Sequence, residues 1–338
     1  MEVIVLSEPF EIDASADVGM VRRRLGALAG EVGLDETRTG DAALIATELG
    51  SNVLKHAQHG GALVGRACDA ERRGVAVAAW DRGPGMNLEA CLRDGMSTAG
   101  TRGAGLGAVR RIATRFDAYT PAGRGSVVTA TVLPDEPPAG GPGTARFAIG
   151  GVCVPYPGLT VCGDAWDSHV DGERATILAC DGLGHGDGAA TAAAAVIAAF
   201  RGAPDAPLAA ILERADRAAR STRGAAATVA RVDLARREVA VAGVGNVAAW
   251  LVGDAVRQLV TQHGTLGQAT PREIREERYR LEPGGLVVLA SDGIRSRWNL
   301  DGYPGLAGRD PLTIATVLWR DLARGRDDAS LVVVREVP

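Results

Sequence analysis

Several features that most proteins have are scarce or missing in this chain of 338 residues. Aromatic residues make up only 4%, so alanine, valine and leucine must fill most of any core. Lys55 is the only lysine among 37 basic residues, so the richness in arginine reflects a compositional bias and indicates nothing about partners. The net charge of −4 gives no electrostatic reason to expect binding to a nucleic acid.

Long hydrophobic runs and paired cysteines are also missing. No apolar stretch reaches the roughly 18–20 residues that span a bilayer, and the N-terminal segment lacks the features of a signal peptide. The five cysteines show no zinc-binding spacing, as expected for free thiols in a reduced compartment. These absences predict a soluble, cytoplasmic protein with no membrane partner.

A proline- and glycine-rich segment, PDEPPAGGPGTA at 134–145, interrupts the chain. It has no apolar periodicity and is typical of a hinge between domains. We predict a first domain over 1–134, a linker over 135–145 and a second domain over 146–338, since the length suggests about two domains.

The first part mixes segments with helical and with strand-like patterns. Helices are expected over about 18–32 and 35–57, where apolar residues recur at helical spacing. Strands are expected at EVIVLSEPFEI, ALVGRAC, VAVAAW and VVTATVL, with a glycine-rich loop and one more helix before the last of them. This order predicts an α+β sandwich.

Strand-like runs dominate the second part. The expected strands are RFAIGGVCVP, LTVCG, RATILAC, ATVARVDL, REVAVAGVG, VAAWLV, LVVLA and SLVVVRE. Helical patterns occur only at about 188–201, 206–220 and 311–324. Many strands with few helices favour stacked antiparallel sheets flanked by helices.

Four short acidic motifs follow one another in the second part. They are CGD at 162–164, CDGLGHG at 180–186, SDGI at 291–294 and RDDAS at 326–330. Aspartates at strand ends, aimed at one point, hold hard divalent cations through oxygen ligands. Two such cations held close together activate water against a phosphate ester. A single DG pair is only a turn signal, but four motifs in this order predict a metal-dependent phosphatase.

Three segments of the first part form a second candidate phosphate site. In ELGSNVLKHA (48–57), Glu48, Asn52 and Lys55 share one helix face because they lie three or four residues apart. The strand VAVAAW leads into DRGPGM (81–86), and TRGAGLGAVRRI (101–112) runs from a glycine-rich loop into a helix. Glycines let backbone amides approach phosphate oxygens, and the positive end of the helix adds to the attraction.

This ordered set resembles the N, G1 and G2 boxes of the GHKL-type (Bergerat-type) ATP-binding fold, especially RsbT/RsbW-like serine kinases, over about residues 10–133. The resemblance implies that Glu48 is the base for the attacking serine. It also implies that Asn52 holds the Mg²⁺ of ATP and that Asp81 accepts a hydrogen bond from the adenine amino group. Further nucleotide contacts are implied for Lys55, Gly83, Gly85, Gly103, Gly105 and Gly107.

The acidic motifs resemble the SpoIIE-type branch of the PPM serine/threonine phosphatases, over about residues 146–336. The resemblance implies that Asp181 is catalytic and bridges two Mn²⁺ or Mg²⁺ ions, one of which also binds the Gly182 carbonyl. It implies that Asp292 and Asp327 complete the second ion, and that Asp164 supports the first. His185 lies two residues beyond the place where better-studied relatives carry a histidine, which favours a loop or substrate contact over a catalytic role.

Together the resemblances imply a GHKL α/β sandwich joined to a PPM-type β-sandwich flanked by helices. The expected function is that of a bacterial partner-switching regulator. It would remove phosphate from a STAS-domain protein or another stressosome or anti-sigma-factor component, and would phosphorylate a partner with ATP. Two alternatives stay open: a phosphatase whose ATP-binding domain is only a sensor or docking module, and a non-enzymatic, nucleotide-dependent anti-sigma binding protein. The sequence leaves dimerisation open.

Overall fold

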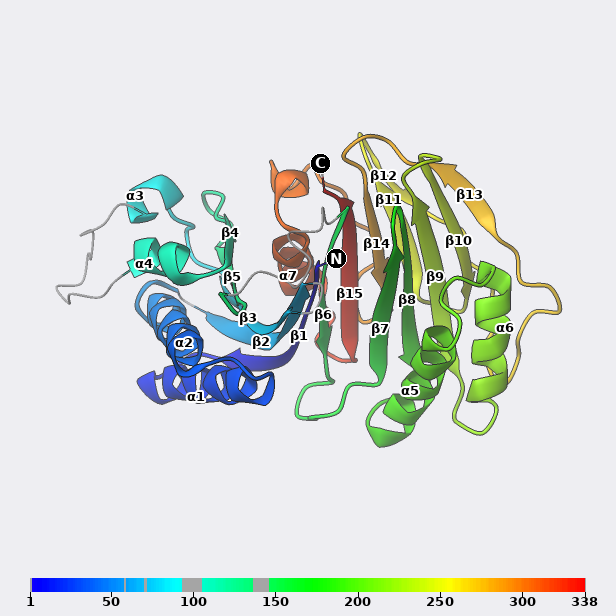
Figure 1. Ribbon diagram of the computed structural model, residues 1–338, viewed down its shortest axis with the longest axis horizontal. Coiled ribbons are helices and arrows are strands. Elements are labelled where there is room, and N and C mark those ends of the chain that lie inside the picture. The colour runs from blue at the N-terminus through cyan, green and yellow to red at the C-terminus, as the bar shows by residue number, and fades with distance from the viewer. Residues whose placement is uncertain (1, 58, 70–71, 93–104, 136–145, 338) are drawn as a thin grey trace. The chain divides into compact units, whose positions relative to one another are not determined.

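The computed structural model describes residues 2–57, 59–69, 72–92, 105–135 and 146–337. It contains two compact units (Figure 1). The first comprises Met1–Ala145 and Pro304–Arg320, and the second comprises Arg146–Tyr303 and Asp321–Pro338. Among the described residues, no helix is both long and apolar enough to cross a membrane.

The first unit is built on an antiparallel sheet with the strand order β1-β2-β3-β5-β4. The strands are β1 (Glu2–Glu11), β2 (Gly60–Asp69), β3 (Arg72–Asp81), β4 (Arg115–Tyr119) and β5 (Val127–Val132). The helices of this unit are α1 (Ser15–Glu31), α2 (Glu36–His56), α3 (Leu88–Leu92), α4 (Gly105–Ile112) and most of α7 (Pro311–Leu322), which follows the 3-10 turn Leu306–Gly308.

Helices α1 and α2 cover one face of this sheet (Figure 1). Their apolar stripes, with Leu25 and Leu28 from α1 and Ile45 and Leu49 from α2, share a core cluster with alternate residues of β3 and β5. Because neighbouring strand residues point to opposite faces, Trp80 and Thr129 point to the other face. There they contact α7, which therefore forms a third layer.

The second unit stacks two antiparallel sheets (Figure 1). One has the order β12-β11-β14-β15-β6, and the other has the order β13-β10-β9-β8-β7. The strands are β6 (Phe147–Val154), β7 (Asp164–Asp171), β8 (Arg174–Gly182), β9 (Ala225–Asp233), β10 (Glu238–Val244), β11 (Ala248–Val252), β12 (Val256–Gln258), β13 (Glu277–Arg280), β14 (Leu286–Ala290) and β15 (Ala329–Glu336). Helices α5 (Asp187–Arg201) and α6 (Leu208–Ala219) bury Val196, Phe200 and Ile211 against β8 and β9.

The predicted fold class is confirmed: an α/β sandwich and a β-sandwich flanked by helices. One predicted strand, LTVCG, is wrong. Residues 159–163 form a loop, and the strand β7 begins only at Asp164. The run is bounded by Gly158, with a φ of 87°, and by Gly163, and its side chains Leu159 and Val161 are exposed. The apolar residues of this run suggested a strand, but among the described residues the run pairs with no neighbouring strand.

The sequence interpretation also missed β4, β12 and β13. Each is short and carries charged or polar side chains, as in RFDAY, VRQ and ERYR. The predicted linker over 135–145 lies outside the described residues except for Asp135. The predicted domain limits, 1–134 and 146–338, stay a prediction about the folding domains.

A buried arginine ties the parts of the first unit together. Arg38, near the start of α2, is 6% exposed. Its Nε donates to the Leu133 carbonyl oxygen at 2.9 Å, and its Nη1 donates to the Ile112 carbonyl oxygen at 3.0 Å. Further bonds reach Asp41 Oδ2 and Thr114 Oγ1, each at 2.7 Å. One side chain thus joins α2 to the ends of α4 and β5.

We expect Arg38→Met to destabilise the protein by about 3 kcal/mol, because buried acceptors lose a charged donor while the apolar stem is kept. Urea unfolding followed by circular dichroism measures this. The control Arg66→Met removes an exposed ion pair with Glu31 and should cost less than about 1 kcal/mol. Equal shifts for the two variants would contradict a special role for Arg38.

Candidate functional site

The first candidate site begins with one face of α2. Glu48 and Asn52 lie one turn apart and are half-buried, whereas Lys55 is exposed near the end of the helix. Glu48 Oε2 accepts a hydrogen bond from the backbone amide of Gly105 at 3.1 Å. Gly105 opens α4 with a φ of 63°, a conformation that favours glycine. The predicted base is therefore held at the start of the glycine-rich helix.

Of the predicted glycines in this loop, Gly107 lies buried in α4, and Gly103 lies outside the described residues. The predicted phosphate contacts of Gly103, Gly105 and Gly107 stay a prediction.

The turn after β3 is shaped around Asp81. Its Oδ1 accepts a hydrogen bond from the amide of Gly83 at 2.7 Å, and the amide of Gly125 donates to the Gly83 carbonyl oxygen at 2.8 Å. A Cβ on Gly85, which has a φ of 77°, would lie 2.5 Å from the Pro121 carbonyl oxygen. Only glycine fits there, so the turn holds the Asp81 carboxylate in one position.

These three segments meet in the first unit. The amide of Arg82 donates to the His59 carbonyl oxygen at 3.0 Å, just beyond the end of α2. A Cβ on Gly83 would lie 3.4 Å from the His56 carbonyl oxygen. The turn of Asp81 therefore abuts one end of the predicted helix face, and the loop at Gly105 contacts that face at Glu48.

The second candidate site gathers aspartates at strand ends. Asp164 begins β7 and lies directly opposite Asp181, near the end of β8. Asp292 follows β14, and Asp327 precedes β15, which pairs with β14. Burial, the largest cause, and the charges of Asp164, Asp292, Asp327 and Asp328 together raise the pKa of Asp181 to about 8. The carboxylates predicted to bind metal therefore lie near enough to repel one another.

Asp164 and Asp328 are the two buried members of the group, at 4% and 3% exposed. Burial, against an opposing hydrogen bond from Ser291, and the charges of Asp328 and Asp292 together raise the pKa of Asp164 to about 7. Asp164 Oδ2 and Asp328 Oδ2 are both buried with no hydrogen-bond partner. Unpaired buried carboxylate oxygens in a repelling group are a donor set that a hard divalent cation satisfies.

Two glycines allow the loops of this site to approach closely. A Cβ on Gly182 would lie 2.1 Å from the Ala189 carbonyl oxygen, and a Cβ on Gly293 would lie 1.9 Å from the Asp328 carbonyl oxygen. Both distances are far below contact, so glycine is required beside Asp181 and beside Asp292.

The donor set fits a metal in its chemistry, but the ligand assignments stay a prediction. In the part of the chain that the structure describes, no three His, Cys, Asp or Glu side chains form a group that could hold an ion. Asp292 Oδ2 instead accepts a hydrogen bond from Asn246 Nδ2 at 2.7 Å. The fit therefore rests on the unpaired oxygens and the mutual repulsion.

Sequence reasoning missed several residues around this site. Asn246 follows β10, outside the acidic motifs, and the polar letter after the apolar run VAVAGVG was its only signal. The amide of Tyr156 donates to Asp328 Oδ1 at 2.7 Å, and its ring stacks on His185 with the centroids 5.0 Å apart. His185 is thus held beside the loop of Asp328, although its predicted contact role stays untested.

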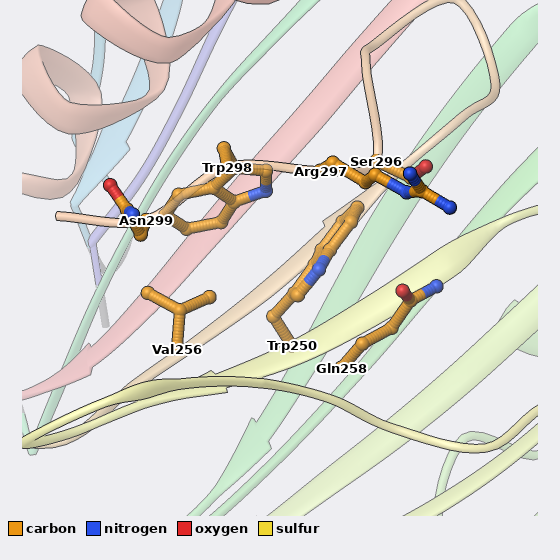
Figure 2. A pocket seen from close by; sticks show the side chains of 7 residues that line it. All are labelled: Trp250, Val256, Gln258, Ser296, Arg297, Trp298 and Asn299. Carbon is orange, nitrogen blue, oxygen red and sulfur yellow. The ribbon is translucent and has the colours of Figure 1, made fainter.

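A cavity of about 570 Å³ lies beside the loop that follows Asp292. Figure 2 shows its lining residues: Trp250, Val256, Gln258, Ser296, Arg297, Trp298 and Asn299. The Trp250 and Trp298 rings lie 5.7 Å apart at an angle of 57°. No predicted site residue lines this cavity, so it is distinct from the group of aspartates.

Comparison with known proteins assigns both units. The sequence profile of the histidine kinase-like ATPase domain matches residues 13–132, and that of Stage II sporulation protein E (SpoIIE) matches residues 171–336. The serine/threonine-protein kinase RsbT of Bacillus subtilis (strain 168) is 31% identical over 110 residues, which cover 32% of this chain and 83% of RsbT. The chain belongs to the RsbT family over its first part, and its second part matches the SpoIIE profile. It carries an RsbT-like, kinase-like ATPase domain followed by a SpoIIE phosphatase domain.

Two solved structures resemble more than half of the chain. A chain from a study of the bacterial stressosome, a modular system adapted to control secondary messenger signaling, is 27% identical. Its TM-score is 0.51, and the match covers 56% of this chain and all of that one. RsbX in complex with magnesium has a TM-score of 0.50 and 19% identity, covering 58% of this chain and 98% of RsbX. At that identity the likeness to RsbX shows the fold alone.

We expect metal binding to reverse a pH dependence of stability. Asp164 and Asp181 have folded pKa values of about 7 and about 8, against 3.8 for an ordinary aspartate. Between these values the folded chain binds more protons than the unfolded chain, so the metal-free protein loses stability as the pH rises. Mn²⁺ requires deprotonated ligands, so its stabilising effect should grow over the same interval.

Thermal unfolding with and without Mn²⁺, at about pH 5 and about pH 8, measures both trends. Asp181→Asn should flatten the pH dependence and reduce the stabilisation by Mn²⁺. The control Asp171→Asn, at the opposite end of the β7–β8 pair, should change neither. Equal stabilisation of the wild type at both pH values would contradict the expectation.

Proposed function

We propose that this protein regulates the phosphorylation of a partner protein in both directions, as a bacterial partner-switching component. The second unit hydrolyses phosphoserine or phosphothreonine on a STAS-domain protein or another stressosome or anti-sigma-factor component. The first unit transfers phosphate from ATP to a serine or threonine of such a partner. The observation that carries the proposal is the mutually repelling group of Asp164, Asp181, Asp292, Asp327 and Asp328 at the strand ends. The RsbT relative and the stressosome chain support the class of partner.

In the phosphatase site, Asp181, Asp292, Asp327 and the Gly182 carbonyl would hold two Mn²⁺ or Mg²⁺ ions, with Asp164 in support. When bound, such cations lower the pKa of water and offset the charge of a phosphate ester. The chain's own contribution is to hold the carboxylates together through the β7–β8 and β14–β15 pairs. The ring of Tyr156 stacks on His185, which would contact a loop of the substrate.

In the kinase site, Glu48 would orient or deprotonate the attacking hydroxyl. Its hydrogen bond from Gly105, at the start of the glycine-rich helix, supports this role. Asn52, one turn further along α2, would hold the Mg²⁺ of ATP. Lys55, three residues beyond Asn52, would contact a phosphate. The Asp81 carboxylate would accept a hydrogen bond from the adenine amino group. Catalysis here would consist mainly of positioning the phosphate and offsetting its charge.

We expect Asp181→Asn to abolish phosphate release from a phosphorylated STAS-domain protein in the presence of Mn²⁺, because the site loses the carboxylate that both ions would share. A phosphate-release assay measures the rate. Asp171→Asn is the matched control and should keep the wild-type rate. Full activity of the Asp181 variant would refute the proposed phosphatase centre.

We expect Glu48→Ala to slow transfer of labelled phosphate from ATP to the partner by about 100-fold or more, the scale of a lost general base. Nucleotide affinity should stay close to that of the wild type, and so should phosphatase activity. Glu36→Ala, an exposed change in the first turn of α2, is the control.

The same assay separates the alternatives. If the wild type binds ATP but transfers no phosphate, the first unit is a sensor or docking module and the kinase proposal fails. Stoichiometric binding of the partner without movement of phosphate in either direction would overturn both activities in favour of a non-enzymatic binding protein.

A further inference from the structure

Helix α7 matches one family by sequence but packs in the unit that matches the other. It lies inside the span that matches SpoIIE, 171–336. Nevertheless, residues Pro304–Arg320 form a compact unit with the ATP-binding part of the chain. The helix packs on the face of the sheet opposite α1 and α2. Near its start the Thr313 and Thr129 hydroxyls lie 2.8 Å apart, and near its end the rings of Trp319 and Trp80 meet edge to face at 5.8 Å.

The last residue of this segment reaches the turn that carries Asp81. Arg320 is 5% exposed. Its Nη1 donates to the Asp81 carbonyl oxygen at 3.0 Å and to the Ser126 carbonyl oxygen at 3.3 Å. The amide of Asp81 donates to the same Ser126 oxygen at 2.9 Å, and Arg82 Nη2 donates to the Arg320 carbonyl oxygen. One guanidinium therefore joins the two strand ends that enclose the turn.

A buried guanidinium at this place carries a cost. Removing an arginine from water is unfavourable unless its donors are satisfied, and two backbone carbonyl oxygens accept from Nη1 of Arg320. Carbonyl oxygens at a strand end are fixed in direction by the sheet, and hydrogen bonds from a charged donor are stronger than those from a neutral one. The arrangement therefore fixes the backbone from which the Asp81 side chain projects.

We propose that Arg320 is a positioning residue of the nucleotide site. It holds the Asp81 backbone from behind the sheet, while the amide of Gly83 holds the Asp81 carboxylate in front. This inference rests on the proposed role of Asp81 toward adenine. It means that the affinity of the kinase-like domain for ATP depends on a side chain supplied by the SpoIIE-matching part of the chain.

The test uses the full-length protein and isothermal titration with a non-hydrolysable ATP analogue. Arg320→Ala should raise the Kd about ten-fold, the scale of a lost charged hydrogen bond. Arg320→Lys should recover part of the affinity, because an ammonium group still donates to a carbonyl oxygen. The ratio of adenine to guanine nucleotide affinity should fall in the alanine variant, since a loosened Asp81 discriminates the base less well.

Thr313→Val is the matched control. It removes a different polar contact of α7 with the sheet, seven residues before Arg320, so it should lower the thermal stability yet keep Kd within about two-fold. If the Thr313 variant weakens nucleotide binding as much as the Arg320 variant does, the role of Arg320 is merely structural and the inference is overturned. Unchanged Kd and base selectivity in Arg320→Ala would overturn it as well.

Asp81→Asn separates this inference from the proposed function. If that variant binds the analogue as the wild type does, Asp81 does not recognise adenine and the proposed nucleotide site itself is wrong. If Asp81→Asn loses binding while Arg320→Ala keeps it, the nucleotide site stands and only the positioning role of Arg320 fails.

Discussion

Repulsion among carboxylates at neighbouring strand ends governs the candidate site of the second unit. The pairing of β7 with β8 sets Asp164 opposite Asp181, and the pairing of β14 with β15 brings the loops of Asp292 and Asp327 to neighbouring strand ends. Each charge is hard to desolvate, and each makes the next more costly. The stability of two sheets holds together a group that would separate in water. A bound cation would relieve this repulsion and would satisfy Asp164 Oδ2 and Asp328 Oδ2, which have no hydrogen-bond partner among the described residues.

In the first unit, the carboxylates of the candidate site are bound by backbone amides. Glu48 and Asp81 each accept a hydrogen bond from a backbone amide of a glycine, Gly105 and Gly83 respectively. Each carboxylate is thereby oriented by the backbone, which suits the hydrogen bonds to adenine and to a hydroxyl that we propose for them. One protein thus surrounds its acidic residues in two ways: with backbone amides in the first unit and with other carboxylates in the second.

Much of this was visible in the sequence, because local chemistry determines it. Helical spacing predicted α1 and α2, and the order of the glycine and acidic motifs predicted both fold families. Contacts between segments distant in sequence were not visible: the stacking of Tyr156 on His185, the bond from Asn246 to Asp292, and the layer formed by α7. The sequence of an amphipathic helix such as α7 predicts that one face is buried, but it does not predict which sheet that face packs against. Short charged edge strands were missed because solvent, rather than a core, selects their side chains.

The path of the backbone has a practical consequence. The chain passes from one unit to the other after Ala145, returns at Pro304, and leaves again after Arg320. Cleavage within 135–145 would therefore nick the protein without releasing either half. A recombinant fragment that stops at this linker would lack the helix behind Trp80 and would leave one side of its sheet bare. Each unit is discontinuous in sequence, so neither can be produced as one uninterrupted segment of the chain.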